Sequence, residues 1–83
     1  MKLKKEDIYN QIVKEYSLNS FEIAEKMSLE FLNKFPNDIR VLNILGALNV
    51  QREDFITALK YLLKTIDINY AFVLIVSIIL YYV

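Results

Sequence analysis

The stretch LNILGALNVQREDFITALKYLL, residues 42–63, contains the clearest structural pattern in the chain. A polar break at residues 51–54 divides the stretch into two parts. On both sides of the break, apolar residues recur at spacings of three and four, and this spacing is the period of one face of an α-helix. The first stripe consists of Val41, Leu42, Leu45, Ala47 and Leu48, and the second of Phe55, Ala58, Leu59, Leu62, Leu63 and Ile66. Asp54 suits the start of the second helix because Asp accepts hydrogen bonds from free N-terminal amides. The stretch predicts two helices joined by a short loop.

Two small residues indicate how these helices meet. A glycine inside a helix costs about 1 kcal/mol relative to alanine, so Gly46 is expected to serve packing by letting the two helices approach closely. Ala58 is expected to be small for the same reason. Phe55 and Leu62 are expected to fill the space between the helices.

Upstream, the same helical period predicts two further helices. The first carries Ile8, Ile12, Val13 and Tyr16 on one face. The second is capped by Asn19 or Ser20, and Asn19 with Glu22 resembles a capping box; its apolar stripe continues to Phe35. Pro36 ends it, because the residue before a proline disfavours the α region. Asn37 and Asp38 supply the cap of the helix that follows.

Downstream, residues 67–70 are predicted to form a short polar connection, and a fifth segment is expected from about Ala71 to Val83. The β-branched residues of this segment would also suit a buried strand. We favour a helix, because the segment is long for a strand and no partner strand is evident elsewhere.

The chain repeats itself at an offset of 34 residues. Identical residues coincide at Phe21 and Phe55, Ala24 and Ala58, Lys26 and Lys60, Leu29 and Leu63, and Ile44 and Ile78. Apolar residues coincide at Ile8 and Leu42, Leu32 and Ile66, Ile39 and Val73, Val41 and Ile75, and Leu45 and Ile79. The expected cap residues Ser20 and Asp54 coincide as well. Such a period predicts stacked helical hairpins of one design.

The repeat resembles the tetratricopeptide repeat (TPR) family, whose period is 34 residues. LNILGAL resembles the family's first helix, EDFITALKYLLKTIDINYA its second, and DINYA its inter-repeat turn. The matching residues are Phe21, Ala24, Pro36, Leu42, Leu45, Gly46, Phe55, Ala58 and Leu62. Asn49, Thr65 and Tyr70 depart from the pattern, as does Gln11-Ile12, which stands where Leu-Gly is usual. The resemblance implies one all-α domain over residues 1–83, a short TPR-like α-solenoid of antiparallel helix-turn-helix hairpins. Repeat one covers 5–38, repeat two 39–72, and a partial third helix 73–83.

Composition excludes several kinds of function. The 83 residues allow one small domain, and ten basic residues balance ten acidic ones, so no nucleic-acid partner is expected. Without Cys or His, the chain lacks the residues of thiol chemistry, imidazole catalysis and zinc sites, and we expect neither a metal nor a cofactor. Glu22, Glu25 and Glu30 are expected to lie on a solvated helix face rather than to form a catalytic cluster. We therefore expect no enzymatic activity.

The resemblance implies a binding groove instead, lined by the first helix of each pair. Its residues would be Glu6, Tyr9, Val13 and Tyr16 from the first repeat, and Arg40, Asn43, Ala47 and Val50 from the second. The Lys/Asn clamp with which some family members hold a C-terminal carboxylate is not matched, because Tyr9 and Val13 occupy its places. The expected function is a non-catalytic protein–protein interaction module of the cytoplasm, either a fragment or a short version of a longer repeat array.

The apolar end of the chain supports an alternative. Asp67 is the last charged residue, and residues 70–83 read YAFVLIVSIILYYV. As a helix this run would span about 21 Å, whereas a bilayer core is about 30 Å thick. The alternative is a small membrane-associated protein anchored by residues 70–83. Otherwise the apolar helix packs on the preceding one and leaves a bare face, which predicts self-association or a continuation of the array.

Overall fold

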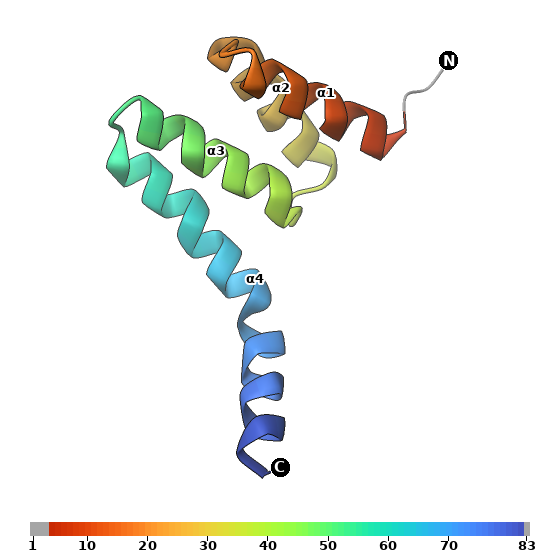
Figure 1. Cartoon of the computed structure of the whole chain (residues 1–83), viewed down its shortest axis with the longest axis vertical. Helices are drawn as coiled ribbons and strands as arrows, with labels where there is room; N and C mark the ends of the chain where they lie inside the picture. Colours follow the sequence, from red (N-terminus) through yellow and green to blue (C-terminus); the bar gives the residue numbers. More distant parts are fainter. Residues whose placement is uncertain (1–3, 83) are drawn as a thin grey trace.

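The computed structural model describes the backbone of residues 4–82 and the side chains of residues 4–67 and 77–81. Four helices follow one another along the chain (Figure 1): α1 (Lys5–Ser17), α2 (Phe21–Lys34), α3 (Ile39–Gln51) and α4 (Phe55–Tyr82). The described residues contain no strand. Each helix packs against the next one in the chain, which confirms the predicted all-α stack of antiparallel hairpins.

The loops α1–α2 and α3–α4 have the same backbone conformation. Asn19 and Glu53, which are 34 residues apart, both adopt a left-handed φ of 61°. Each loop is closed by an amide-to-carbonyl hydrogen bond, from Ser20 to Glu15 at 2.9 Å and from Asp54 to Asn49 at 2.8 Å. The sequence repeat is therefore also a repeat of the turn geometry.

Two of the three predicted helix caps are confirmed. The Oδ1 atom of Asp38 accepts from the amides of Arg40 (3.1 Å) and Val41 (3.3 Å), and that of Asp54 accepts from the amide of Thr57 (3.2 Å). The capping box expected at Asn19 is wrong, because Asn19 occupies the left-handed position that closes α1. Asparagine tolerates this conformation better than most residues. The alternative residue, Ser20, stands at the N-cap position of α2, but its side chain makes no capping hydrogen bond.

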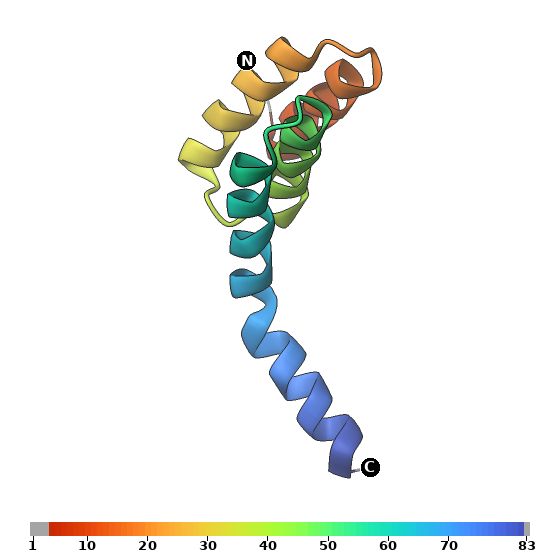
Figure 2. The same ribbon diagram turned by 90° about the vertical axis from the view of Figure 1, so that its left-hand side faces the viewer.

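The predicted polar connection at residues 67–70 is also wrong. α4 runs through it as one helix from Phe55 to Tyr82, so the segment 73–83, predicted as a separate helix, belongs to α4 as far as Tyr82. The physical reason is that residues 55–82 include neither Pro nor Gly, and ordinary polar residues cost a helix at most about 0.7 kcal/mol each. The C-terminal half of α4 projects beyond the other three helices (Figure 2).

The core lies where the first three helices meet. Ile12, Phe31 and Val41, each at most 3% exposed, form one buried cluster between α1, α2 and α3. Ala24, Leu45 and Leu48 form a second cluster between α2 and α3, which Tyr61 of α4 joins. Both clusters draw on the apolar stripes of the sequence, so the helical period correctly predicted these buried faces.

The contact between α3 and α4 confirms the packing role of Gly46. A Cβ atom on Gly46 would lie 2.9 Å from Cδ2 and 3.2 Å from Cγ of Leu62, and 3.8 Å from the carbonyl oxygen of Ala58. Ala58 itself is 2% exposed. The two helices thus meet through the small residues that the sequence placed there.

Phe55, in contrast, does not fill the space between helices as expected. Its side chain is 62% exposed at the first turn of α4. The equivalent Phe21 is half-buried and lies against Tyr16, with ring centroids 5.6 Å apart. At the position equivalent to Tyr16, the second hairpin has Val50, which offers no ring.

Ser28 is the one described residue with a buried side-chain polar atom that lacks a hydrogen-bond partner within the described structure. Its side chain is 0% exposed, and an unpaired buried polar group costs about 1–3 kcal/mol. Ser28→Ala is therefore expected to raise the free energy of unfolding by about 1 kcal/mol, measured by urea denaturation followed by circular dichroism. Ser17→Ala is the control, because that hydroxyl is exposed and donates to the carbonyl of Lys14. A destabilising Ser28→Ala would contradict this assignment.

Candidate functional site

The predicted groove residues lie on α1 and α3, which run side by side in the same direction (Figures 1 and 2). Residues 34 apart in sequence occupy the same level on the two helices, as the contact between Glu6 and Arg40 shows. We call this surface the α1/α3 face, and it consists of Glu6, Tyr9, Val13, Tyr16, Arg40, Asn43, Ala47 and Val50. Its two ends differ in chemistry.

Arg40 organises the charged end. Its Nη1 and Nη2 atoms donate to the two carboxylate oxygens of Glu6 at 2.9 and 2.8 Å. The same guanidinium donates to both oxygens of Asp38, from Nη2 at 3.1 Å and from Nε at 3.3 Å. It also lies 4.0 Å from the ring centroid of Tyr9. One side chain therefore ties α1 to the start of α3, and the planar fork of arginine is what allows it.

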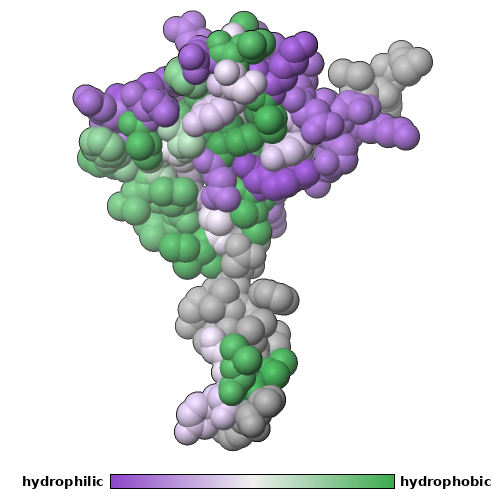
Figure 3. All heavy atoms as spheres, viewed as in Figure 1, coloured by the Kyte–Doolittle hydropathy of each residue, from purple (hydrophilic) through white to green (hydrophobic). Residues whose placement is uncertain are grey.

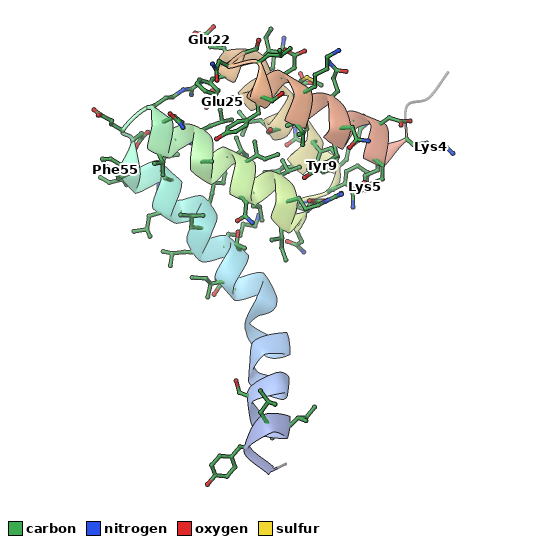
Figure 4. The ribbon with its side chains drawn as sticks, viewed as in Figure 1. Lys4, Lys5, Tyr9, Glu22, Glu25 and Phe55 are labelled. Carbon is green, nitrogen blue, oxygen red and sulfur yellow. The ribbon has the colours of Figure 1, made fainter. Side chains whose placement is uncertain are left out.

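Lys5 completes this end of the face (Figure 4). Its Nζ atom lies 3.3 Å from Asp38 Oδ2 and 4.6 Å from the ring centroid of Phe35. Two cations, Lys5 and Arg40, thus meet two carboxylates, Glu6 and Asp38. The charges balance, so the charged end has no net attraction for an anionic or a cationic ligand.

These contacts shift the acidity of both carboxyls. The hydrogen bond from Arg40 lowers the pKa of Glu6 below its ordinary value. Burial by itself would raise the pKa of Asp38, whose side chain is 5% exposed, but the hydrogen bonds from Arg40, the Val41 amide and Lys5 outweigh burial and lower it. The two carboxylates in turn raise the pKa of Arg40. Glu6, Asp38 and Arg40 are therefore charged at neutral pH.

The cluster makes stability depend on pH in the acid range. Unfolded Asp and Glu have pKa values of about 3.9 and 4.3, whereas the folded pKa values of Asp38 and Glu6 lie lower. The unfolded state therefore binds more protons in this range, and the stability from these groups, complete above about pH 5, is lost as pH falls through the folded pKa values. We expect the urea midpoint to fall between pH 5 and pH 3, and to fall less in Asp38→Asn, which keeps a capping oxygen but no charge.

Asp67→Asn is the matched control for this prediction. Asp67 is exposed and makes no hydrogen bond or ion pair with any described residue, so its variant is expected to keep the acid dependence of the wild type. An Asp38→Asn variant whose midpoint falls as steeply as that of the wild type would show that the cluster does not carry the effect.

The other end of the α1/α3 face is apolar. Val13 is 39% exposed and Val50 is 45% exposed, and the other two apolar members of this end, Tyr16 and Ala47, are half-buried. Asn43 is exposed, and its Oδ1 accepts from the hydroxyl of Thr65 on α4 at 3.4 Å. Thus Arg40 contacts both Glu6 and Tyr9, while Val13 and Val50 expose apolar surface.

A second feature was not foreseen from the sequence. Glu25 of α2, expected on a solvated face, forms an ion pair with Arg52 in the loop between α3 and α4. The pair borders an open hollow at the start of α2, beside Ser20, Phe21 and Glu22. Glu25 and Arg52 are 27 residues apart in sequence, and no local spacing predicts their contact. Glu22 is exposed, as expected.

Neither a metal centre nor a membrane span is found among the described residues. The described side chains form no group of three or more acidic residues able to hold a metal ion. Within the same residues no helix combines the length and the hydrophobicity that crossing a bilayer requires. Comparison of the chain with protein-family models, with curated proteins and with solved structures found no match.

Proposed function

We propose that this chain is a non-catalytic, TPR-like protein–protein interaction module that binds an apolar peptide segment on its α1/α3 face. The observation that carries the proposal is the exposure of Val13 and Val50 at one end of this face. Val13 belongs to α1 and Val50 to α3, and Tyr16 and Ala47, which the face also includes, are half-buried. Two adjoining helices present a surface that is ordered before the ligand arrives, which lowers the entropy cost of binding.

The charged end of the face supports binding by holding that surface in place. The hydrogen bonds from Arg40 to Glu6 join α1 to α3, the two helices that carry the apolar residues. Because the charges of this cluster are already paired, we expect selectivity to come from apolar side chains of the ligand rather than from its charge.

Selection from a random peptide library against the full chain tests this function. Peptides that bind the wild type are expected to lose at least tenfold in affinity for Val13→Asp and Val50→Asp, because each variant places a charge where apolar surface is buried. Ile23→Asp is the control, since Ile23 is 53% exposed on α2 and lies away from the face. Affinities are measured by fluorescence anisotropy.

Two results would contradict the proposal. One is a library that yields no binding peptide at all. The other is a set of peptides that binds Val13→Asp and Val50→Asp as tightly as the wild type and the Ile23→Asp control. Circular dichroism of each variant shows that the helices are intact. The membrane-anchor alternative concerns residues 70–83, of which 70–76, 82 and 83 lie outside the described side chains, and it remains a prediction.

A further inference from the structure

The N-terminal half of α4 packs on the rest of the molecule with one face only. Ala58 is 2% exposed, and Tyr61 packs against the buried cluster between α2 and α3. One turn further along the same face, the Thr65 hydroxyl donates to Asn43 of α3. The opposite face of this half of α4 is therefore turned away from α3.

That opposite face carries four large apolar side chains, which we call the α4 stripe. Their spacings of three, four and three residues place them in one line along the helix, the pattern by which two helices pack side by side. They are 76%, 54%, 50% and 59% exposed for Ile56, Leu59, Leu63 and Ile66 in turn. In the space-filling view the upper half of α4 forms part of a hydrophobic area (Figure 3). A contiguous apolar stripe of this kind indicates an interaction site, whereas isolated apolar residues do not.

The first hairpin shows that a continuation of the repeat would not cover this face. Glu22 and Leu29 of α2 are the residues 34 positions before Ile56 and Leu63. Both are exposed, although α3 packs on α2. A further helix that packed on α4 as α3 packs on α2 would therefore leave Ile56 and Leu63 open. The partner of the α4 stripe has to approach from a different side.

The α4 stripe is complementary to a reversed copy of itself. Read from either end it has the order Ile-Leu-Leu-Ile and the same three spacings. When a second α4 lies antiparallel to the first, Ile56 meets Ile66 of the other copy and Leu59 meets Leu63. A two-fold axis repeats both contacts, so every residue of the stripe gains an apolar partner.

The charges beside the stripe are complementary in the same arrangement. Lys60 and Asp67 each come directly after a stripe residue, so they lie along the same edge of it, and both are exposed. In an antiparallel pair these two edges face each other, which brings Lys60 of each copy to Asp67 of the other. A parallel pair would instead set them against the opposite edge, where Phe55 and Leu62 directly precede stripe residues. The charges therefore favour the antiparallel pair.

We propose that two copies of this chain associate through an antiparallel pairing of their α4 stripes. The two-fold axis passes between Leu59 and Leu63, so the contact lies within residues 56–67, whose side chains the structure describes. It extends over about three helical turns. So short a contact belongs to the small, weak class of interface, and we expect a dimer that dissociates on dilution. The inference is independent of the proposed peptide-binding face, which α1 and α3 form.

Sedimentation velocity of the full chain over a range of concentrations tests the association. We expect a concentration-dependent dimer, and at least a tenfold weaker association for Leu59→Glu and for Leu63→Glu, because each places a charge in the apolar contact. Leu29→Glu is the matched control for Leu63→Glu. It changes the same side chain at the equivalent position of α2, where leucine is 44% exposed, and is expected to dimerise like the wild type.

The variants are expected to fold, because α2 already carries a glutamate, Glu25, at the position equivalent to Leu59. Circular dichroism checks the helical content of each. A wild type that remains monomeric at every concentration would overturn the proposal. So would a dimer that Leu59→Glu and Leu63→Glu leave as tight as that of the wild type, since the contact would then lie elsewhere on the chain.

Exchange of the two edge charges tests the orientation. Lys60→Glu sets two carboxylates against each other in its own dimer, and Asp67→Lys sets two ammonium groups against each other. Each variant alone is therefore expected to associate at least about threefold more weakly than the wild type at low salt. An equimolar mixture of the two restores both opposite-charge pairs and is expected to form a heterodimer as tight as the wild-type dimer. A mixture that associates no better than its components would overturn the antiparallel pairing.

Phosphatidylcholine vesicles separate self-association from attachment of the stripe to a lipid surface. A dimer that stays in solution when vesicles are added supports the proposal. Vesicle binding by a monomeric chain that is lost in Leu59→Glu and kept in Leu29→Glu would assign the α4 stripe to lipid and overturn the dimer.

Discussion

Gly46→Leu is expected to unfold the chain or to leave it with little residual stability. Even a Cβ atom at this position would lie 2.9 Å from Leu62, so the larger leucine side chain must push α3 and α4 apart. Overpacking of a tight contact costs typically about 1–3 kcal/mol, and here it also opens the contact around Ala58, which is 2% exposed. The total stability of a chain of this size is about 4–12 kcal/mol. The measurement is thermal unfolding followed by circular dichroism.

Two further variants separate packing from the intrinsic effect of glycine. Gly46→Ala gains about 1 kcal/mol of helix propensity, while its Cβ meets only the flexible end of Leu62 and a more distant carbonyl, so we expect a small net change. Leu62→Ala removes the side chain that the added atoms would strike. Combining it with Gly46→Leu is therefore expected to restore part of the lost stability, a coupling that a double-mutant cycle measures. A Gly46→Leu chain with an unchanged melting temperature would refute the assignment of this contact.

Leu45→Ala is expected to lower the free energy of unfolding by about 2–5 kcal/mol, because it leaves a cavity in a core that has few other large side chains. Leu45 is 0% exposed and belongs to the cluster that joins α2 to α3. Because α3 also supports α4, we expect all four helices to lose structure in one transition. Urea denaturation followed at 222 nm gives both the midpoint and the slope.

Leu29→Ala is the matched control for Leu45→Ala. It removes the same atoms from a helix, but Leu29 is 44% exposed on α2, so the loss is expected to be a fraction of that at Leu45. Equal losses at the two positions would mean that the α2–α3 cluster is not the core. A reduced denaturant slope in Leu45→Ala would indicate that α1 and α2 unfold separately from α3 and α4.

The α1/α3 face was partly predictable from the sequence. The spacing of Glu6 and Arg40, one in each repeat, placed both on the predicted groove, and the structure brings them into contact. The sequence did not predict that Asp38 and Lys5 would join this contact to form a cluster of four charged residues. Their participation depends on how far each long side chain reaches across two helices. The same holds for Glu25 and Arg52, which no local pattern connects.

The sequence by itself determined the all-helical fold, the 34-residue repeat and the small residues of the α3–α4 contact, because each of these depends on local spacing and on the size of a side chain. Only the tertiary structure decided that Phe55 faces outward and that Arg40 joins Glu6 and Asp38 in one cluster. The reason is that a side chain is buried, exposed or paired according to what packs against it. Those neighbours come from parts of the chain that local sequence does not identify.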